Sequence, residues 1–146
     1  SNYAQSLKEK SKELEAMEHL SKENQYLHKR EAFLCNQLIK QTELFNKLKT
    51  TKYIDNKLWQ EIKEKIDLLF DNYTKRLCHQ IPSLTDGDIQ ICCLIKLRFS
   101  NGDIANMLAI SPTSVSKRKL RLKERIVQEI GSLGENQSLD LWLMEY

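Results

Sequence analysis

Residues 84–126 read LTDGDIQICCLIKLRFSNGDIANMLAISPTSVSKRKLRLKERI, and this stretch decides the fold. Thr85, followed three residues later by Asp88, forms a capping box, which is typical of the start of a helix. Ser100 is a second cap, and the apolar residues after it predict a short helix that runs to about Leu108. The segment therefore begins with two short helices that are closely spaced.

A third helix is predicted to start at Pro112. Ser111 offers a capping hydroxyl, and proline suits the first helical position because its missing N–H would be unpaired there anyway. Helical spacing groups the apolar residues on one face, which we expect to pack on the two preceding helices: Val115, Leu122 and Ile126. The opposite face is predicted to point outward with Thr113, Ser116, Lys117, Leu120 and Arg121.

Positive charge is concentrated on this third helix. Residues 111–126 contain six cationic side chains and one acidic one, a net charge of +5 in a chain whose total is +3. Such a cluster can neutralise DNA phosphates while side chains near the helix start reach base edges in the major groove; the alternative is a solvated basic face. The candidate DNA-binding residues are Thr113, Ser114, Ser116, Lys117, Arg118, Leu120, Arg121 and Arg125.

The motifs of this segment resemble the LuxR/GerE type of helix-turn-helix. The matching residues are Leu84-Thr85 with Asp88, Ser100-Asn101, Asp103-Ile104-Ala105, Leu108, Ile110-Ser111, Ser114-Val115 and Arg125-Ile126. The flanking residues Phe70, Tyr73, Arg76, Leu77 and Pro82 look like those of Bacteroides-type regulators, in which such a domain follows tetratricopeptide repeats, a membrane span and a coiled coil. The resemblance implies a transcription regulator, here the cytoplasmic part of a protein that is anchored in a membrane.

Three positions depart from the family pattern. Arg98 stands where the family usually has glycine, so the bend between the first two helices lacks an easy left-handed residue. Ser116 replaces a lysine of the family, and Leu120 is apolar at a position that often contacts the groove. The base preference of the family therefore cannot be carried over to this chain.

The first fifty residues are predicted to form one long coiled-coil helix, because the segment from about Tyr3 to Leu48 contains neither proline nor glycine. Two neighbouring heptad columns form the seam, one with Leu20, Leu27, Leu34, Gln41 and Leu48 and the other with Met17, Asn24, Glu31, Leu38 and Phe45. We expect a parallel homodimer through Leu20, Asn24, Leu27, Leu34 and Leu38. The alternative is a hairpin in which this helix folds back on residues 55–80.

Residues 51–82 are predicted to form a linker helix that packs on the C-terminal domain. Asp55 can cap it, and Pro82 ends it, since proline is excluded from a helix interior. Its apolar stripe is Leu58, Ile62, Ile66, Leu69, Phe70, Tyr73 and Leu77. The chain is thus expected to be all-α, with a coiled-coil helix at 1–50, the linker helix at 51–82, the helix-turn-helix domain at 83–130 and an apolar tail at 131–146.

The tail follows a predicted helix end at Gly131. Leu139, Trp142 and Leu143 are expected to pack on the linker helix or on a second protomer; a lid over the basic helix is the less favoured alternative. The tail is too short to span a membrane.

The composition argues against an enzyme. The sequence shows no Gly-rich phosphate loop, metal-ligand cluster or catalytic constellation, and we expect no cofactor and no small-molecule ligand. Four cysteines without paired spacing read as buried thiols of a cytoplasmic protein: Cys35, Cys78, Cys92 and Cys93. Two functions remain. The first is a dimeric regulator that binds double-stranded DNA, and the second is an oligomerisation or adaptor module whose basic helix contacts an acidic protein such as RNA polymerase.

Overall fold

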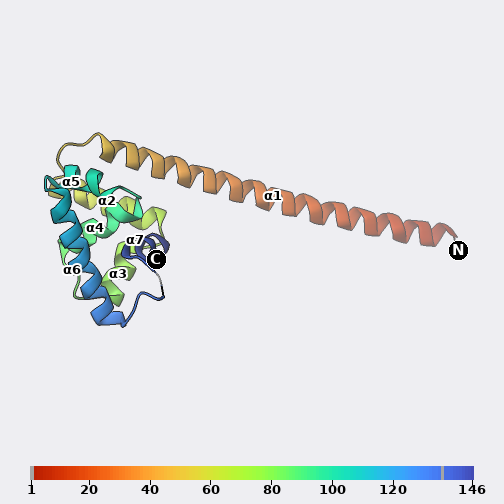
Figure 1. Cartoon of the computed structure of the whole chain (residues 1–146). Helices are drawn as coiled ribbons and strands as arrows, with labels where there is room; N and C mark the ends of the chain where they lie inside the picture. The colour runs from red at the N-terminus through yellow and green to blue at the C-terminus, as the bar shows by residue number, and fades with distance from the viewer. Residues whose placement is uncertain (1, 136) are drawn as a thin grey trace. The chain divides into compact units, whose positions relative to one another are not determined.

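The computed structural model describes residues 2–135 and 137–146, and this part of the chain is helical without any strand. The helices are α1 (Asn2–Lys49), α2 (Asn56–Leu69), α3 (Tyr73–Gln80), α4 (Asp86–Lys96), α5 (Asn101–Leu108), α6 (Pro112–Ile130) and α7 (Leu139–Glu145). The chain divides into two units, Ser1–Ile39 and Lys40–Tyr146. In the second unit α4 is central and contacts α2, α6 and α7 (Figure 1). The prediction of an all-α chain is confirmed.

The first unit consists of the greater part of α1, whose bounds agree with the predicted long helix. Its seam leucines keep much of their surface in water: Leu20 is 57%, Leu27 52% and Leu34 50% exposed. Asn24 and Leu38 are exposed as well. The three leucines Leu20, Leu27 and Leu34 therefore form an exposed apolar stripe along α1.

The last turns of α1 belong to the core of the second unit. Leu44 and Leu48 are buried there, and the ring of Phe45 stacks on that of Phe99 with 4.4 Å between centroids. The assignment of Phe45 and Leu48 to the seam is therefore wrong, because burial within the domain removes both side chains from a coiled-coil surface. The heptad pattern alone cannot distinguish burial in a domain core from burial in a coiled-coil seam.

The predicted single linker helix is two helices. The chain turns between α2 and α3, where Asp71 and Asn72 adopt left-handed φ values of 49° and 55°. Asp67 accepts hydrogen bonds from the backbone N–H of Thr74 at 2.7 Å and from its hydroxyl at 2.6 Å, which ties the two helices together. Asp and Asn tolerate this conformation better than most residues do, so the turn needs no glycine. The apolar stripe misled the prediction because both helices face the same core.

The three predicted helix starts of residues 84–126 are confirmed. Asp88 N–H donates to Thr85 Oγ1 at the start of α4, and Asp103 N–H donates to Ser100 Oγ at the start of α5. Ser111 caps α6, with Pro112 in its first turn. Each start is made by residues within three positions of each other, which is why the sequence could predict it.

The ends of α4 and α5 are built on left-handed residues that are not glycine. After α4, Arg98 has φ 67°, and the N–H of Phe99 reaches back to the carbonyl of Leu94 at 3.1 Å. After α5, Ala109 has φ 54° and is followed by the matching bond from Ile110. This is the Schellman arrangement, and a non-glycine residue in it costs about 1–2 kcal/mol. Burial of Phe99 against the core offsets this cost at Arg98.

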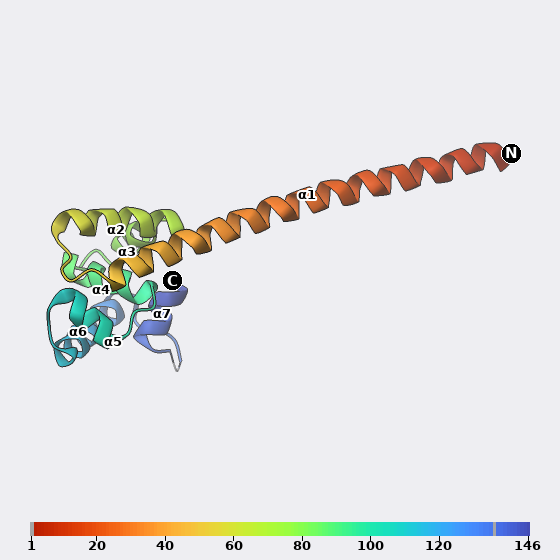
Figure 2. The same cartoon turned by 90° about the horizontal axis from the view of Figure 1, so that it is seen from above.

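The C-terminal helix α7 packs chiefly on α4 (Figure 2). Leu139 and Leu143 are buried, and the hydroxyl of Tyr73 donates to the carbonyl of Leu143 at 2.9 Å. The expected contact with the linker segment is made at α3, where Arg76 donates to the carbonyl of Tyr146 at 2.8 Å and the rings of Tyr73 and Tyr146 meet edge to face. The tail is not a lid, because its apolar residues complete the domain core.

A lysine strengthens this contact between α4 and α7. Lys96 donates to the carbonyl of Met144 at 2.6 Å, and its ammonium lies 5.0 Å from the ring centroids of Phe70 and Tyr73. Burial lowers the pKa of Lys96, and the positive charge of Arg76 lowers it further. The hydrogen bond and the two aromatic rings offset part of the desolvation cost of the Lys96 ammonium.

The cysteines divide into two kinds. Cys92 and Cys93 are fully buried in α4, where desolvation raises the pKa of both thiols, so they are inert core residues. Cys35 and Cys78 are exposed, so the prediction of four buried thiols is wrong for these two. None of the helices among the described residues combines the length and the apolar character needed to cross a bilayer.

Candidate nucleic-acid interface

Helix α6 is held in place by one apolar face. Val115, Leu122 and Ile126 are completely buried, as predicted, and α6 packs closely on α5 and also contacts α4. The Ser111 cap and the left-handed Ala109 set the angle between α5 and α6. The face opposite the buried residues is consequently directed away from the core.

The exposed face of α6 collects most of the predicted binding residues. Its exposed members include Thr113, Ser116, Lys117, Arg118, Leu120, Arg121 and Lys123; we call this set the α6 face. Within the described residues, none of its four cations has an acidic partner within salt-bridge distance. The α6 face is therefore a cationic surface whose charge is not neutralised by its own chain.

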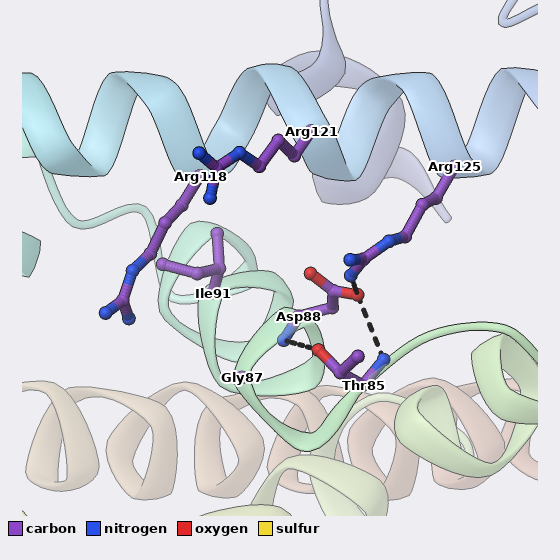
Figure 3. Close-up of a pocket in the computed structure, with 7 residues that line it drawn as sticks. All are labelled: Thr85, Gly87, Asp88, Ile91, Arg118, Arg121 and Arg125. Carbon is purple, nitrogen blue, oxygen red and sulfur yellow. Dashed lines mark hydrogen bonds and ion pairs between the residues drawn. The ribbon is translucent and has the colours of Figure 1, made fainter.

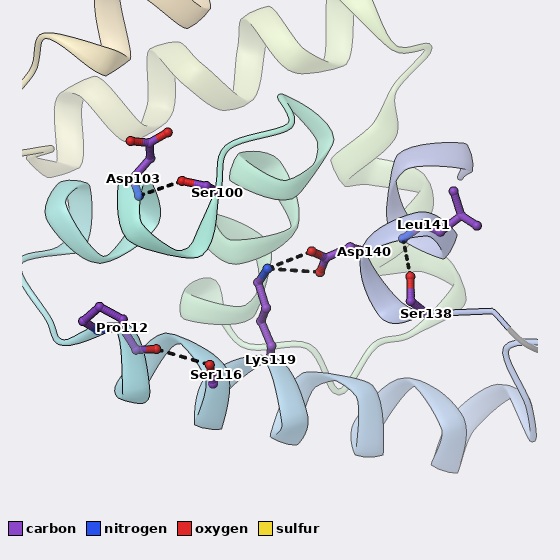
Figure 4. A network of polar contacts seen from close by, with 8 residues as sticks. All are labelled: Ser100, Asp103, Pro112, Ser116, Lys119, Ser138, Asp140 and Leu141. Carbon is purple, nitrogen blue, oxygen red and sulfur yellow. Dashed lines mark hydrogen bonds and ion pairs between the residues drawn. The ribbon is translucent and has the colours of Figure 1, made fainter.

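Two predicted residues also have structural contacts at the start of α6. Ser114 is half-buried; its N–H donates to Ser111 Oγ at 3.1 Å, and its hydroxyl accepts from the Ser111 hydroxyl at 2.9 Å. The hydroxyl of Ser116 donates to the carbonyl of Pro112 at 3.3 Å, although the residue stays exposed (Figure 4). The hydroxyl of Ser114 is thus occupied by the cap, whereas that of Ser116 remains accessible.

Arg125 lies apart from the α6 face because it is paired inside the domain. Its guanidinium donates to Oδ2 of Asp88, the same oxygen that accepts the N–H of Thr85 in the capping box. The start of α4 and the middle of α6 are thus joined by one carboxylate (Figure 3). This pairing explains why an acidic residue follows Thr85 at this spacing and why a basic residue stands at position 125.

A pocket of about 290 Å³ lies between the start of α4 and the flank of α6. Three arginines line it at helical spacing, Arg118, Arg121 and Arg125, together with Thr85, Gly87, Asp88 and Ile91 of α4 (Figure 3). Asp88 neutralises Arg125 only, so the open side of this pocket is cationic. The α4 residues of this pocket were not predicted from the sequence, although the i, i+3, i+7 spacing of the arginines indicates that one flank of α6 faces a neighbouring element.

A second carboxylate binds α6 from the C-terminal helix. Asp140 accepts two hydrogen bonds from the ammonium of Lys119, at 3.0 and 3.1 Å (Figure 4). Lys119 is nearly buried, with a side chain that is 11% exposed. Helix α7 therefore neutralises one cation on the flank of α6 and leaves the α6 face uncovered.

Replacing Asp88 by alanine is expected to lower the free energy of unfolding by about 1–3 kcal/mol, because it removes half of the capping box and leaves Arg125 without its partner. The measurement is urea-induced unfolding followed by circular dichroism. Asp86→Ala is the matched control, since Asp86 is an exposed acidic residue in the same first turn, and we expect a loss of about 0.5 kcal/mol or less. Equal losses for the two variants would contradict a structural role of the Asp88–Arg125 pair.

The described residues contain no group of histidine, cysteine or carboxylate side chains that could hold a metal ion. The α6 face itself offers positive charge and hydrogen-bonding side chains. Comparison of the chain with known protein families, with characterised proteins and with solved structures finds no match.

Proposed function

We propose that the protein binds duplex DNA in a sequence-specific manner and regulates transcription, with α5 and α6 acting as a helix-turn-helix and α6 as the recognition helix. The observation that carries this proposal is the α6 face, where Lys117, Arg118, Arg121 and Lys123 are exposed and have no acidic partner among the described residues. A basic helix that is merely solvated need not be fixed in position. Helix α6 is fixed, because it is capped at its start and buried along its apolar side, and its cationic side is exposed.

The division of labour on α6 follows from its geometry. Cations along the flank contact phosphates and supply affinity that is independent of sequence. Side chains at the start of the helix reach base edges when α6 lies in the major groove, and Thr113, Ser116 and Lys117 occupy those positions. The resemblance of residues 84–126 to the LuxR/GerE helix-turn-helix supports the same assignment.

A homodimer through α1 completes the proposal. The exposed stripe of Leu20, Leu27 and Leu34 has heptad spacing, and two such stripes bury each other in a parallel coiled coil. Pairing of two chains presents two recognition helices to two half-sites, which multiplies affinity for DNA that carries both. We place this pair in the cytoplasm, as part of a membrane-anchored regulator of the Bacteroides type.

The adaptor function has one observation in its favour. The α6 face offers few side chains that accept hydrogen bonds, Thr113 and Ser116 being the hydroxyl groups near the helix start. A cationic face of this kind also suits an acidic protein, such as a subunit of RNA polymerase. Direct measurement of DNA binding separates the two functions.

The experiment is selection of bound sites from a pool of random duplexes with the full chain, followed by titration of the enriched site at several salt concentrations. We expect two related half-sites and a logarithmic affinity that falls with the logarithm of salt concentration by about 0.9 per phosphate contacted. Failure to enrich any sequence would contradict specific DNA binding and leave the adaptor function as the better proposal.

A further inference from the structure

Leu120 is an apolar side chain in the middle of the cationic α6 face. It is 59% exposed, and its neighbours one turn away on the helix surface, Ser116, Lys117, Lys123 and Glu124, are all exposed and polar. The core side of α6 is formed by other residues, so packing within the chain does not account for a leucine at this position. Its isobutyl group is exposed to solvent, although the helix that carries it is packed on the core through its opposite face.

The position of Leu120 along α6 matches that of a residue in contact with bases. It is the third residue after Lys117, which places it about 4.5 Å further along the axis and on the same side of the helix. The cations beside it, Lys117 and Arg121, would hold this side against the groove through phosphate contacts. A side chain at this place meets the base edges when the helix lies in the major groove.

Base edges in the major groove offer one apolar group, the C5 methyl of thymine. We propose that Leu120 contacts a thymine methyl and so specifies an A·T pair in each half-site; this inference rests on the proposed DNA binding. An acidic protein is a poorer partner for the α6 face than DNA, since its carboxylates would pair with the cations but would give Leu120 no apolar group to contact. The leucine therefore acts as a specificity residue and not as a source of general affinity.

The test uses duplexes of the selected site in which single thymines are replaced by deoxyuridine, which keeps every hydrogen bond and removes only the methyl group. For the unaltered protein we expect one position in each half-site at which this replacement lowers affinity about fourfold, the effect of burying one methyl-sized group. For Leu120→Ala we expect the thymine and uracil duplexes to bind equally well. Both affinities should lie near that of the unaltered protein on uracil.

Leu68→Ala is the matched control, because Leu68 is an exposed leucine of α2, outside the α6 face. We expect it to retain the full sensitivity to the thymine methyl. The proposal is overturned if no uracil replacement weakens binding, if the selected half-sites lack thymine, or if Leu120→Ala keeps the sensitivity of the unaltered protein. These results all presuppose binding to the selected duplex, so failure of the inference is distinguishable from failure of the proposed DNA binding, in which no duplex binds specifically.

Discussion

Replacing Lys117 and Arg121 together by glutamate is expected to lower the affinity for the selected duplex by at least about 100-fold, while the circular dichroism spectrum stays helical. Both side chains are exposed on the α6 face and have no acidic partner among the described residues, so the change adds four negative units where phosphates would lie. Fluorescence anisotropy at several salt concentrations measures the loss. Removal of two phosphate contacts should also reduce the salt slope by about 1.8.

The matched control carries the same change of charge on another helix. Lys57 and Lys65 are exposed on α2, which packs on α3 and α4, whereas α6 packs on α5 and α4. Lys57→Glu with Lys65→Glu therefore tests the effect of net charge alone, and we expect a loss of affinity of about threefold or less at moderate salt, since distant charges are screened. Equal losses in the two double variants, or undiminished binding by the α6 variant, would show that α6 is not the recognition helix.

Replacing Leu27 by glutamate is expected to weaken the dimer by at least about 100-fold, because each chain would bring an unpaired carboxylate into the apolar seam at a cost of about 2 kcal/mol or more. Leu27 lies in the middle of the stripe and is 52% exposed in the single chain, so the folded domain loses nothing when it changes. Light scattering at micromolar concentration measures the mass. On a duplex with two half-sites, the affinity should fall to that for one half-site.

Asn36→Glu is the control for this variant. Asn36 is exposed on α1 at a heptad position outside the two seam columns, and its replacement adds the same single charge. We expect it to remain dimeric. A dimer that survives Leu27→Glu would assign pairing to another surface, and a monomeric unaltered chain would rule out the coiled coil altogether.

The parts of the fold that the sequence predicted are those made by neighbours along the chain. The caps at Thr85, Ser100 and Ser111 each use a side chain and an N–H three residues later, so their geometry is local. The buried face of α6 follows from helical period alone. The absence of proline and glycine likewise predicted the extent of α1.

The predictions were wrong where the local sequence pattern was compatible with two different environments for the same side chain. Phe45 and Leu48 continue the heptad columns, yet Leu48 is buried in the core and Phe45 packs against it, since period does not say which surface will cover a side chain. The apolar stripe of residues 58–77 runs through the turn at Asp71 and Asn72 because α2 and α3 bury their faces in one core. The pairing of Arg125 with Asp88, 37 residues away, could not be predicted from the local pattern either.

The sequence by itself determined that this chain is helical, where α4, α5 and α6 begin, and which side of α6 is apolar and which is cationic. These properties depend on residues within one or two turns of each other, whose interactions require no contact with distant parts of the chain. Only the tertiary structure decided which cations remain available. Asp88 pairs with Arg125 and Asp140 with Lys119, whereas Lys117 and Arg121 have no acidic partner in the part of the chain that the structure describes, and Leu120 stays exposed between them. Which cations are paired depends on contacts between elements far apart in the chain, and this cannot be predicted from the charge of a single helix.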